Sequence, residues 1–194
     1  MKLKMLTSLI LLGVFAQTLE AGTIKGKIIA SRVRSPENVV ISLEGVKGEF
    51  TPPKENPVMD QKSLIFIPHV LPVLAGTTVD FPNNDKVRHN VFSPSKAKKF
   101  NLGTYAAGVV RNVTFDTPGF YPLLCNVHAE MSAFILVFEN PYFAVSNRDG
   151  EFEIKDVPAG TYTLRTWHQK LKESKQEVTV PEQGEIAVEL KLER

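Results

Sequence analysis

Short apolar stretches that alternate with polar residues, interrupted every few residues by proline or glycine, constrain the fold of this chain most strongly. Residues 24–28 and 186–192 alternate apolar and polar side chains with a period of two, which is typical of half-buried β-strands. Residues 132–138, SAFILVF, are continuously apolar, as expected for a strand covered on both faces. Asp149–Gly150 predicts a tight turn. No long helix is expected after the first 21 residues, and the pattern predicts an all-β fold made of β-sandwiches.

Residues 1–21 have the composition of a secretion signal peptide. Lys2 and Lys4 give a basic start, and residues 6–16 form an apolar core that is shorter than the ~20 residues of a membrane-spanning helix. Ala21 is the expected last residue before cleavage; the alternative is a buried first helix or strand. We therefore expect an exported protein, periplasmic or secreted. No later segment is apolar for long enough to span a bilayer, so we expect no stable membrane insertion.

The charge of the chain is close to balanced. It has 23 Lys and Arg residues against 21 Asp and Glu residues, a formal net charge of +2. This balance gives no reason to expect binding to nucleic acid or to an anionic membrane surface.

Two changes in the pattern of strand and turn residues divide the rest of the chain. Residues 48–57, GEFTPPKENP, contain three prolines and break the strand pattern. The pattern changes again near residue 140, where shorter predicted strands and tight turns begin. We therefore divide the chain after the signal peptide into residues 22–50, 51–140 and 141–194.

The only cysteine, Cys125, points to a metal site. An exported protein with one cysteine cannot form an internal disulfide, and an exposed free thiol would oxidise. Cys125 is therefore either buried and inert, or held as a thiolate by a metal. His128 follows it by three residues and Met131 by six, and His89 follows the predicted strand TTVDF. One thiolate, two imidazoles and a weak thioether are the ligands of a type 1 (blue) copper site, so we predict one copper ion at these four residues.

Residues 63–140 resemble the cupredoxins, the family of blue copper proteins. AGTTVDFPNNDKVRHNVFS, residues 75–93, resembles the family's strand and loop that carry the first histidine ligand. TPGFYPLLCNVHAEM, residues 117–131, resembles its strand and Cys-x-x-His loop, with the short spacing to Met seen in amicyanin. The resemblance implies a Greek-key β-sandwich. It also implies copper bound in a plane by two histidines and the cysteine, with the methionine as axial ligand.

The same resemblance assigns roles to residues beside the ligands. Asn90 would connect the two ligand loops by hydrogen bonds, and the ring edge of His128 would reach the surface and pass the electron. Val127 and Ala129 would then form a small apolar rim for a redox protein partner. Val127 departs from the family pattern, because close relatives often have proline before this histidine.

Residues 141–194 resemble a second family, the carboxypeptidase regulatory-like domains, which form a transthyretin-like sandwich. The resemblance rests on DGEFEIKDVPAGTYTLRTWH, residues 149–168. Such domains usually begin with two strands, which residues 22–30 and 38–46 match. We hypothesise that the cupredoxin part is inserted into a split transthyretin-like domain, which would have a structural role.

These features together predict an exported protein that transfers single electrons through one copper ion. We do not expect an enzyme, because the chain lacks the additional histidines of a second, catalytic copper. His69 and His168 are expected to have no metal role. Two alternatives remain open: a periplasmic copper carrier or storage protein, and an adhesion or carbohydrate-binding module.

Overall fold

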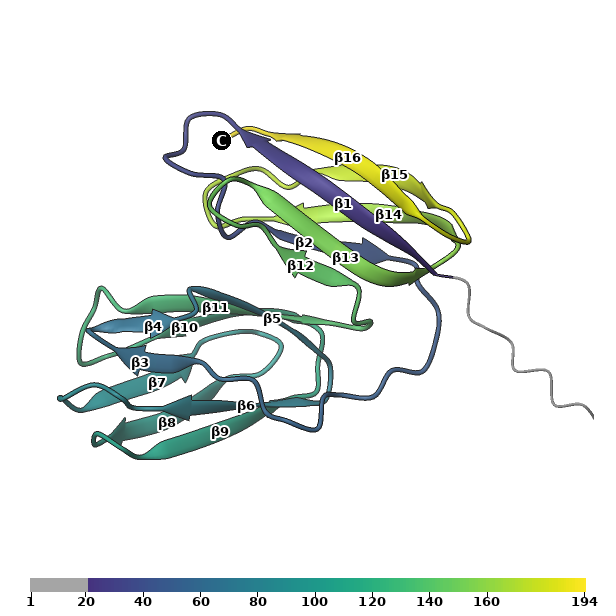
Figure 1. Cartoon of the computed structure of the whole chain (residues 1–194). Helices are drawn as coiled ribbons and strands as arrows, with labels where there is room; N and C mark the ends of the chain where they lie inside the picture. The colour runs from purple at the N-terminus through teal and green to yellow at the C-terminus, as the bar shows by residue number, and fades with distance from the viewer. Residues whose placement is uncertain (1–20) are drawn as a thin grey trace, which may run out of the picture.

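The computed structural model describes residues 21–194, so the signal-peptide prediction lies outside the described residues except for Ala21. These residues form sixteen β-strands and no α-helix, which confirms the predicted all-β fold. Within this range, no helix has the length and apolar character needed to cross a bilayer. The strands make two units, one above the other in Figure 1.

The central unit contains the strands between residues 60 and 138. Its five-stranded sheet has the order β5-β11-β10-β7-β8, and β6 pairs with β9 and β3 with β4. The strands are β3 (Asp60–Lys62), β4 (Ile65–Ile67), β5 (Val70–Leu74), β6 (Thr77–Pro82), β7 (His89–Ser93), β8 (Phe100–Tyr105), β9 (Val110–Phe115), β10 (Gly119–Leu124) and β11 (Ser132–Phe138).

The flanking unit combines strands from both ends of the described chain. One sheet has the order β13-β1-β16 and the other the order β12-β2-β14-β15. The strands are β1 (Ala21–Ala30), β2 (Val40–Glu44), β12 (Phe143–Val145), β13 (Glu151–Pro158), β14 (Gly160–Trp167), β15 (Lys175–Val180) and β16 (Glu185–Leu192).

The route of the chain between the two units follows from the strand pairing. β1 pairs with β13 and β16, and β2 pairs with β12 and β14. The chain therefore leaves the flanking unit after β2, forms the central unit, and returns at β12 (Figure 1). The exact domain boundaries and the transthyretin-like relationship stay predictions.

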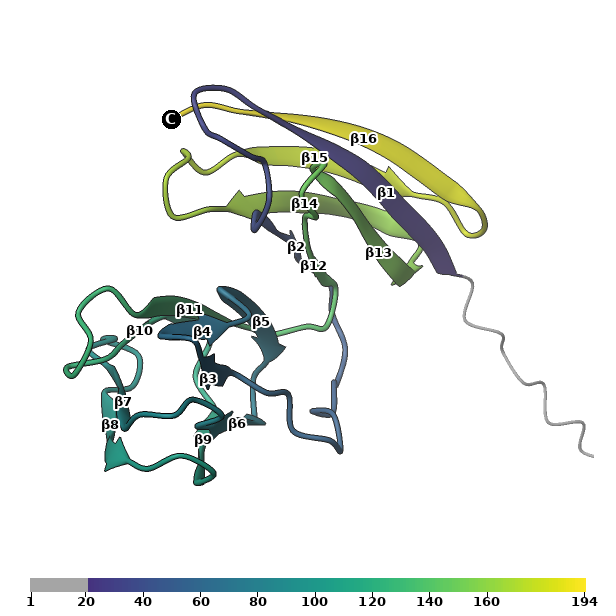
Figure 2. The ribbon, with the colours of Figure 1, turned by 60° about the vertical axis from the view of Figure 1, so that its left-hand side comes forward.

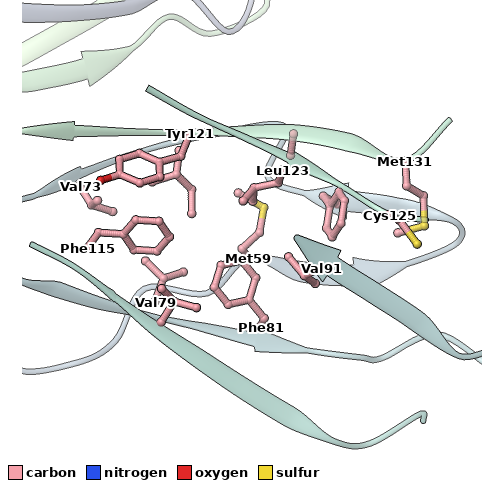
Figure 3. Packing of buried hydrophobic residues seen from close by; sticks show 14 of the residues in the cluster. Met59, Val73, Val79, Phe81, Val91, Phe115, Tyr121, Leu123, Cys125 and Met131 are labelled. Carbon is pink, nitrogen blue, oxygen red and sulfur yellow. The ribbon is translucent and has the colours of Figure 1, made fainter. Parts of the chain in front are cut away.

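Each unit has its own hydrophobic core. In the central unit, Phe115 and Tyr121 are fully buried and meet edge to face, with ring centroids 5.0 Å apart. Burial of each such side chain contributes roughly 1.5–3 kcal/mol to stability. Figure 3 shows this core between the sheets, with the sulfur atoms of Cys125 and Met131 at one end of it. The core thus extends to the predicted metal ligands.

The two units pack against each other through the outer face of β11. Along this strand Ala133, Ile135 and Val137 are buried in the central core, whereas Leu136 belongs to a separate cluster with Val40 of the flanking unit. Both faces of residues 132–138 are therefore covered, as their continuous apolar sequence predicts. In both ribbon views, β10 and β11 lie beneath β2 and β12 (Figures 1 and 2).

Candidate metal centre

The predicted ligands lie at one end of the central unit, where three strands begin or end. β10 and β11 are antiparallel, and their last paired residues are Leu124 and Ser132. Cys125 directly follows Leu124, and Met131 directly precedes Ser132. The register therefore places the two sulfur side chains at the same end of the core (Figure 3). β7 pairs with β10 through Phe92 and Leu124, which brings His89 to this end as well.

Three of the four predicted ligands form a compact group. The ligand atoms of His89, Cys125 and His128 all lie within 4.8 Å of one another, and within residues 21–194 no other such group of three is found. His89 has no exposed surface, Cys125 is 5% exposed and His128 is half-buried. A thiol and two imidazoles are thus directed at one small volume at the end of the core.

The spacing of the histidine nitrogens fits a metal ion. The Nδ1 atoms of His89 and His128 are 3.1 Å apart. Two nitrogens that each bind one ion at about 2.0–2.1 Å are separated by about this distance. Mixed sulfur and imidazole donors favour copper or zinc among the biological metals. The residues present therefore fit a metal centre of the predicted kind.

Met131, the fourth predicted ligand, lies in the hairpin between β10 and β11. Its side chain is fully buried, and its backbone N–H donates to the His128 carbonyl at 3.1 Å, which closes a tight turn. Figure 3 shows its sulfur beside that of Cys125. The neighbouring Glu130 is exposed, so the buried thioether is the better placed of the two side chains.

Asp85 holds His89 in place, a contact that the sequence reasoning missed. Its Oδ2 atom lies 3.0 Å from Nε2 of His89 and accepts a hydrogen bond of 2.8 Å from the Leu64 N–H. Donation from Leu64, from His89 and from the Lys86 N–H lowers the pKa of Asp85 from 3.8 to about 2. An ionised carboxylate accepts the Nε2 proton, so Nδ1 of His89, which faces Nδ1 of His128, keeps its lone pair.

The loop before His89 is fixed by hydrogen bonds of its own. The Asn83 amide donates to the carbonyls of Val87 at 2.9 Å and of Tyr105 at 3.2 Å. Its Oδ1 accepts from the Asp85 N–H at 3.1 Å. An Asn side chain commonly accepts from the backbone N–H two residues on, so the sequence could have indicated this turn but not the contact of Asp85 with His89. The position of His89 is therefore set by the protein itself.

Asn90 makes the connection that the family resemblance implies, but only weakly. Its Oδ1 accepts from the Asn126 N–H at 3.5 Å, a long hydrogen bond, whereas its amide donates to Asn101 at 2.8 Å. Val127 and Ala129, on either side of His128, are both exposed, and Val127 is 47% exposed. The half-buried His128 thus has an apolar surface next to it.

The two remaining histidines lie away from this group. Nε2 of His69 is 2.9 Å from Nε2 of Gln169, a contact between the two units. Nδ1 of His168 accepts from the Lys170 N–H at 3.2 Å, and burial lowers the pKa of His168. The structure brings neither histidine to Cys125.

Comparisons with known proteins give limited likenesses. A family model described as polysaccharide lyase family 4, domain II, matches residues 138–188, which lie mainly in the flanking unit. No curated protein matches this chain.

Solved structures with a likeness to the chain include three from copper proteins. A purple cupredoxin from Nitrosopumilus maritimus is 24% identical over 42% of this chain and 96% of its own, with a TM-score of 0.37. An oxidised point mutant of amicyanin is 22% identical over 44% of this chain and 84% of its own, with a TM-score of 0.41. A copper-containing nitrite reductase from Thermus scotoductus SA-01 is 23% identical over 58% of this chain and 28% of its own, with a TM-score of 0.43. At these identities and TM-scores, the case for a function depends on the His–Cys–His group of this chain itself.

Proposed function

We propose that this protein is an exported blue copper protein that transfers single electrons between redox protein partners. One observation carries the proposal: the ligand atoms of His89, Cys125 and His128 converge within 4.8 Å at the buried end of the central core. A thiolate and two imidazoles would also suit zinc, but the added thioether of Met131 makes the ligand set of a blue copper site. Bound copper would supply one-electron chemistry at this position.

Each residue of the site has a role in the proposal. His89, Cys125 and His128 would hold the ion, and Met131 would be the weak fourth ligand. Asp85 orients His89 through Nε2, and the fixed loop around Asn83 restrains both. Because His89 is buried and Cys125 nearly so, water has little access. A site fixed in this way would rearrange little when the ion gains or loses an electron, which favours fast transfer.

Electron exchange would take place at the surface around His128. This ring is only half-buried, and the exposed Val127 and Ala129 flank it, so a partner could approach closely at this point. The partners are not identified by any residue described above. We propose electron transfer rather than catalysis, because a second, catalytic copper would need further histidines, and His69 and His168 contact Gln169 and Lys170 instead.

The flanking unit is proposed to have a structural role as the two halves of a split domain around the copper unit. Residues 22–46 pair with strands of the C-terminal part, an arrangement that supports the insertion hypothesis. Export to the periplasm or beyond is proposed from the sequence of residues 1–21 alone.

The alternatives make different predictions. A copper carrier or storage protein would exchange its metal readily and would have no redox partner. The fixed position of His89 argues against this, since exchange is faster from flexible, exposed ligands. An adhesion or carbohydrate-binding module would keep its whole function after Cys125→Ala.

A visible absorption spectrum of the mature protein with added copper(II) tests the proposal. We expect an intense blue band that disappears on reduction and returns on oxidation. His69→Ala is the matched control, because it removes a histidine that lies away from the site and should leave the band unchanged. A colourless protein with a freely titratable Cys125 thiol would contradict the proposal.

A further inference from the structure

A groove lies between the two units, away from the metal centre. Its volume is about 710 Å³, within the range of ~300–1,000 Å³ that small-molecule sites have. Phe120, in its wall, is five residues before Cys125 in an extended segment, so the Cα atoms of these two residues are about 16 Å apart, and no predicted ligand lines the groove. Metal binding therefore does not account for the groove, and we look for a separate ligand.

One wall of the groove is aromatic and comes from the central unit. Phe120 and Phe138 lie on the outer face of β10 and β11. Phe120 stacks on Phe134 with centroids 5.5 Å apart and an interplanar angle of 24°, which covers one face of its ring. Phe120 is nevertheless 43% exposed, so part of its side chain is accessible from the groove that it lines. Trp167 of β14, in the flanking unit, also lines the groove, and its ring centroid lies 5.3 Å from that of Phe120.

The opposite wall is polar and comes from the flanking unit. Arg165 donates to Glu44 at 2.9 Å, and both side chains are partly exposed along β14 and β2. Lys47 and Glu139 are the other charged residues of the lining. Two acidic and two basic side chains balance each other, so the groove has no net preference for an anion or a cation.

We propose that this groove binds a neutral oligosaccharide. A sugar ring has C–H bonds on one face and hydroxyl groups around its edge. The C–H face fits against the exposed part of the Phe120 side chain, while the hydroxyl groups can bond to Arg165 and Glu44 on the opposite wall. The balanced charges favour a neutral glycan over a polyanionic one. The proposal is independent of metal binding.

Trp167 provides a direct test, because it is the only tryptophan in the chain and lines the groove. The mature protein would be titrated with cellohexaose, maltohexaose and a galacturonic-acid oligomer while tryptophan emission is recorded. A saturable change with at least one neutral oligosaccharide is expected. Phe120→Ala should weaken that binding roughly tenfold, because it removes the stacking face. Arg165→Gln should weaken it as well.

Ile29→Ala is the matched control, since Ile29 is an exposed apolar residue on β1, outside the groove lining. It should bind as the unchanged protein does, and thermal unfolding monitored by circular dichroism would show that each variant is folded. The proposal is overturned if neither neutral oligosaccharide gives a saturable change, or if only the acidic oligomer binds. Equal binding by folded Phe120→Ala and the unchanged protein would also overturn it.

Discussion

The central and flanking units bury polar side chains for different purposes. In the flanking unit, Ser146 accepts from the Val39 N–H and donates to the Pro36 carbonyl, which completes backbone hydrogen bonds in a loop. In the central unit, the buried Asn83 and His89 are connected through Asp85. Buried polar groups that serve only the backbone are a structural feature, whereas a set that converges on one imidazole positions that ring for chemistry.

The contrast predicts that changes in the two units will separate stability from metal binding. Changes near Cys125 should act first on the metal centre, and changes in the flanking core should act on stability alone.

The largest effect is expected from Cys125→Ser. The hydroxyl group is a poor copper ligand compared with a thiolate, so the blue band should be lost completely. Because serine is smaller and polar at a buried position, we expect a stability loss of about 1–3 kcal/mol, without unfolding of the protein. Absorption spectra and denaturant unfolding measure the two effects. A folded Cys125→Ser variant that keeps the blue band would show that Cys125 is not a ligand.

Leu164→Ala tests the core of the flanking unit. Leu164 is fully buried on β14, and its truncation should cost roughly 2–5 kcal/mol by loss of burial and formation of a cavity. The absorption spectrum of the folded, copper-loaded variant should stay unchanged. Denaturant unfolding and the spectrum are measured on the same sample. A changed spectrum would show that the two units are coupled and that the separation is wrong.

Asp85→Asn tests the contact to His89. Asparagine keeps the size of the side chain but removes the charge, so it holds the Nε2 proton less strongly. We expect the blue band to remain and copper affinity to fall roughly 10- to 100-fold, together with a shift in reduction potential. Competition with a chelator measures the affinity, and Asp80→Asn, on the neighbouring β6, is the control. Unchanged affinity and potential would leave Asp85 without a positioning role.

The pH dependence of the metal-free protein gives a further test. The pKa of Asp85 is lowered from 3.8 to about 2 in the folded protein. Asp85 therefore contributes stability above pH 3.8, and this contribution is lost as the pH falls toward about 2, since the unfolded state takes up the proton first. Thermal unfolding at a series of pH values should show a shallower acid dependence in Asp85→Asn. Parallel curves for the two proteins would contradict this assignment.

The smallest effect is expected at the contact between the units. Gln169→Ala removes the exposed hydrogen bond to His69, which should cost no more than about 1 kcal/mol. Copper spectra should not change, because His69 is away from the centre. Denaturant unfolding measures the loss. A much larger loss would mean that this single contact holds the two units together.

Much of the architecture and of the candidate site follows from local sequence. The period of two in residues 186–192 predicts a strand, and β16 covers that segment. The three-residue spacings from Cys125 to His128 and from His128 to Met131 predict a single ligand loop, because a tight turn after a strand directs such side chains to one side. His89 could be added to the predicted metal ligands, because it is a histidine that follows a predicted strand, TTVDF, as the family's first ligand does.

Only the tertiary structure revealed Asp85 as a partner of His89 and the groove between Phe120 and Arg165. Asp85 is one of several polar residues in its loop, and its role depends on the Leu64 N–H, which the strand pairing of a distant hairpin brings to it. Phe120 and Arg165 are far apart in sequence and line the same groove only because sheets of the two units pack together. Local patterns determine strands and short loops, whereas contacts between distant segments depend on how the whole chain minimises its exposed apolar surface.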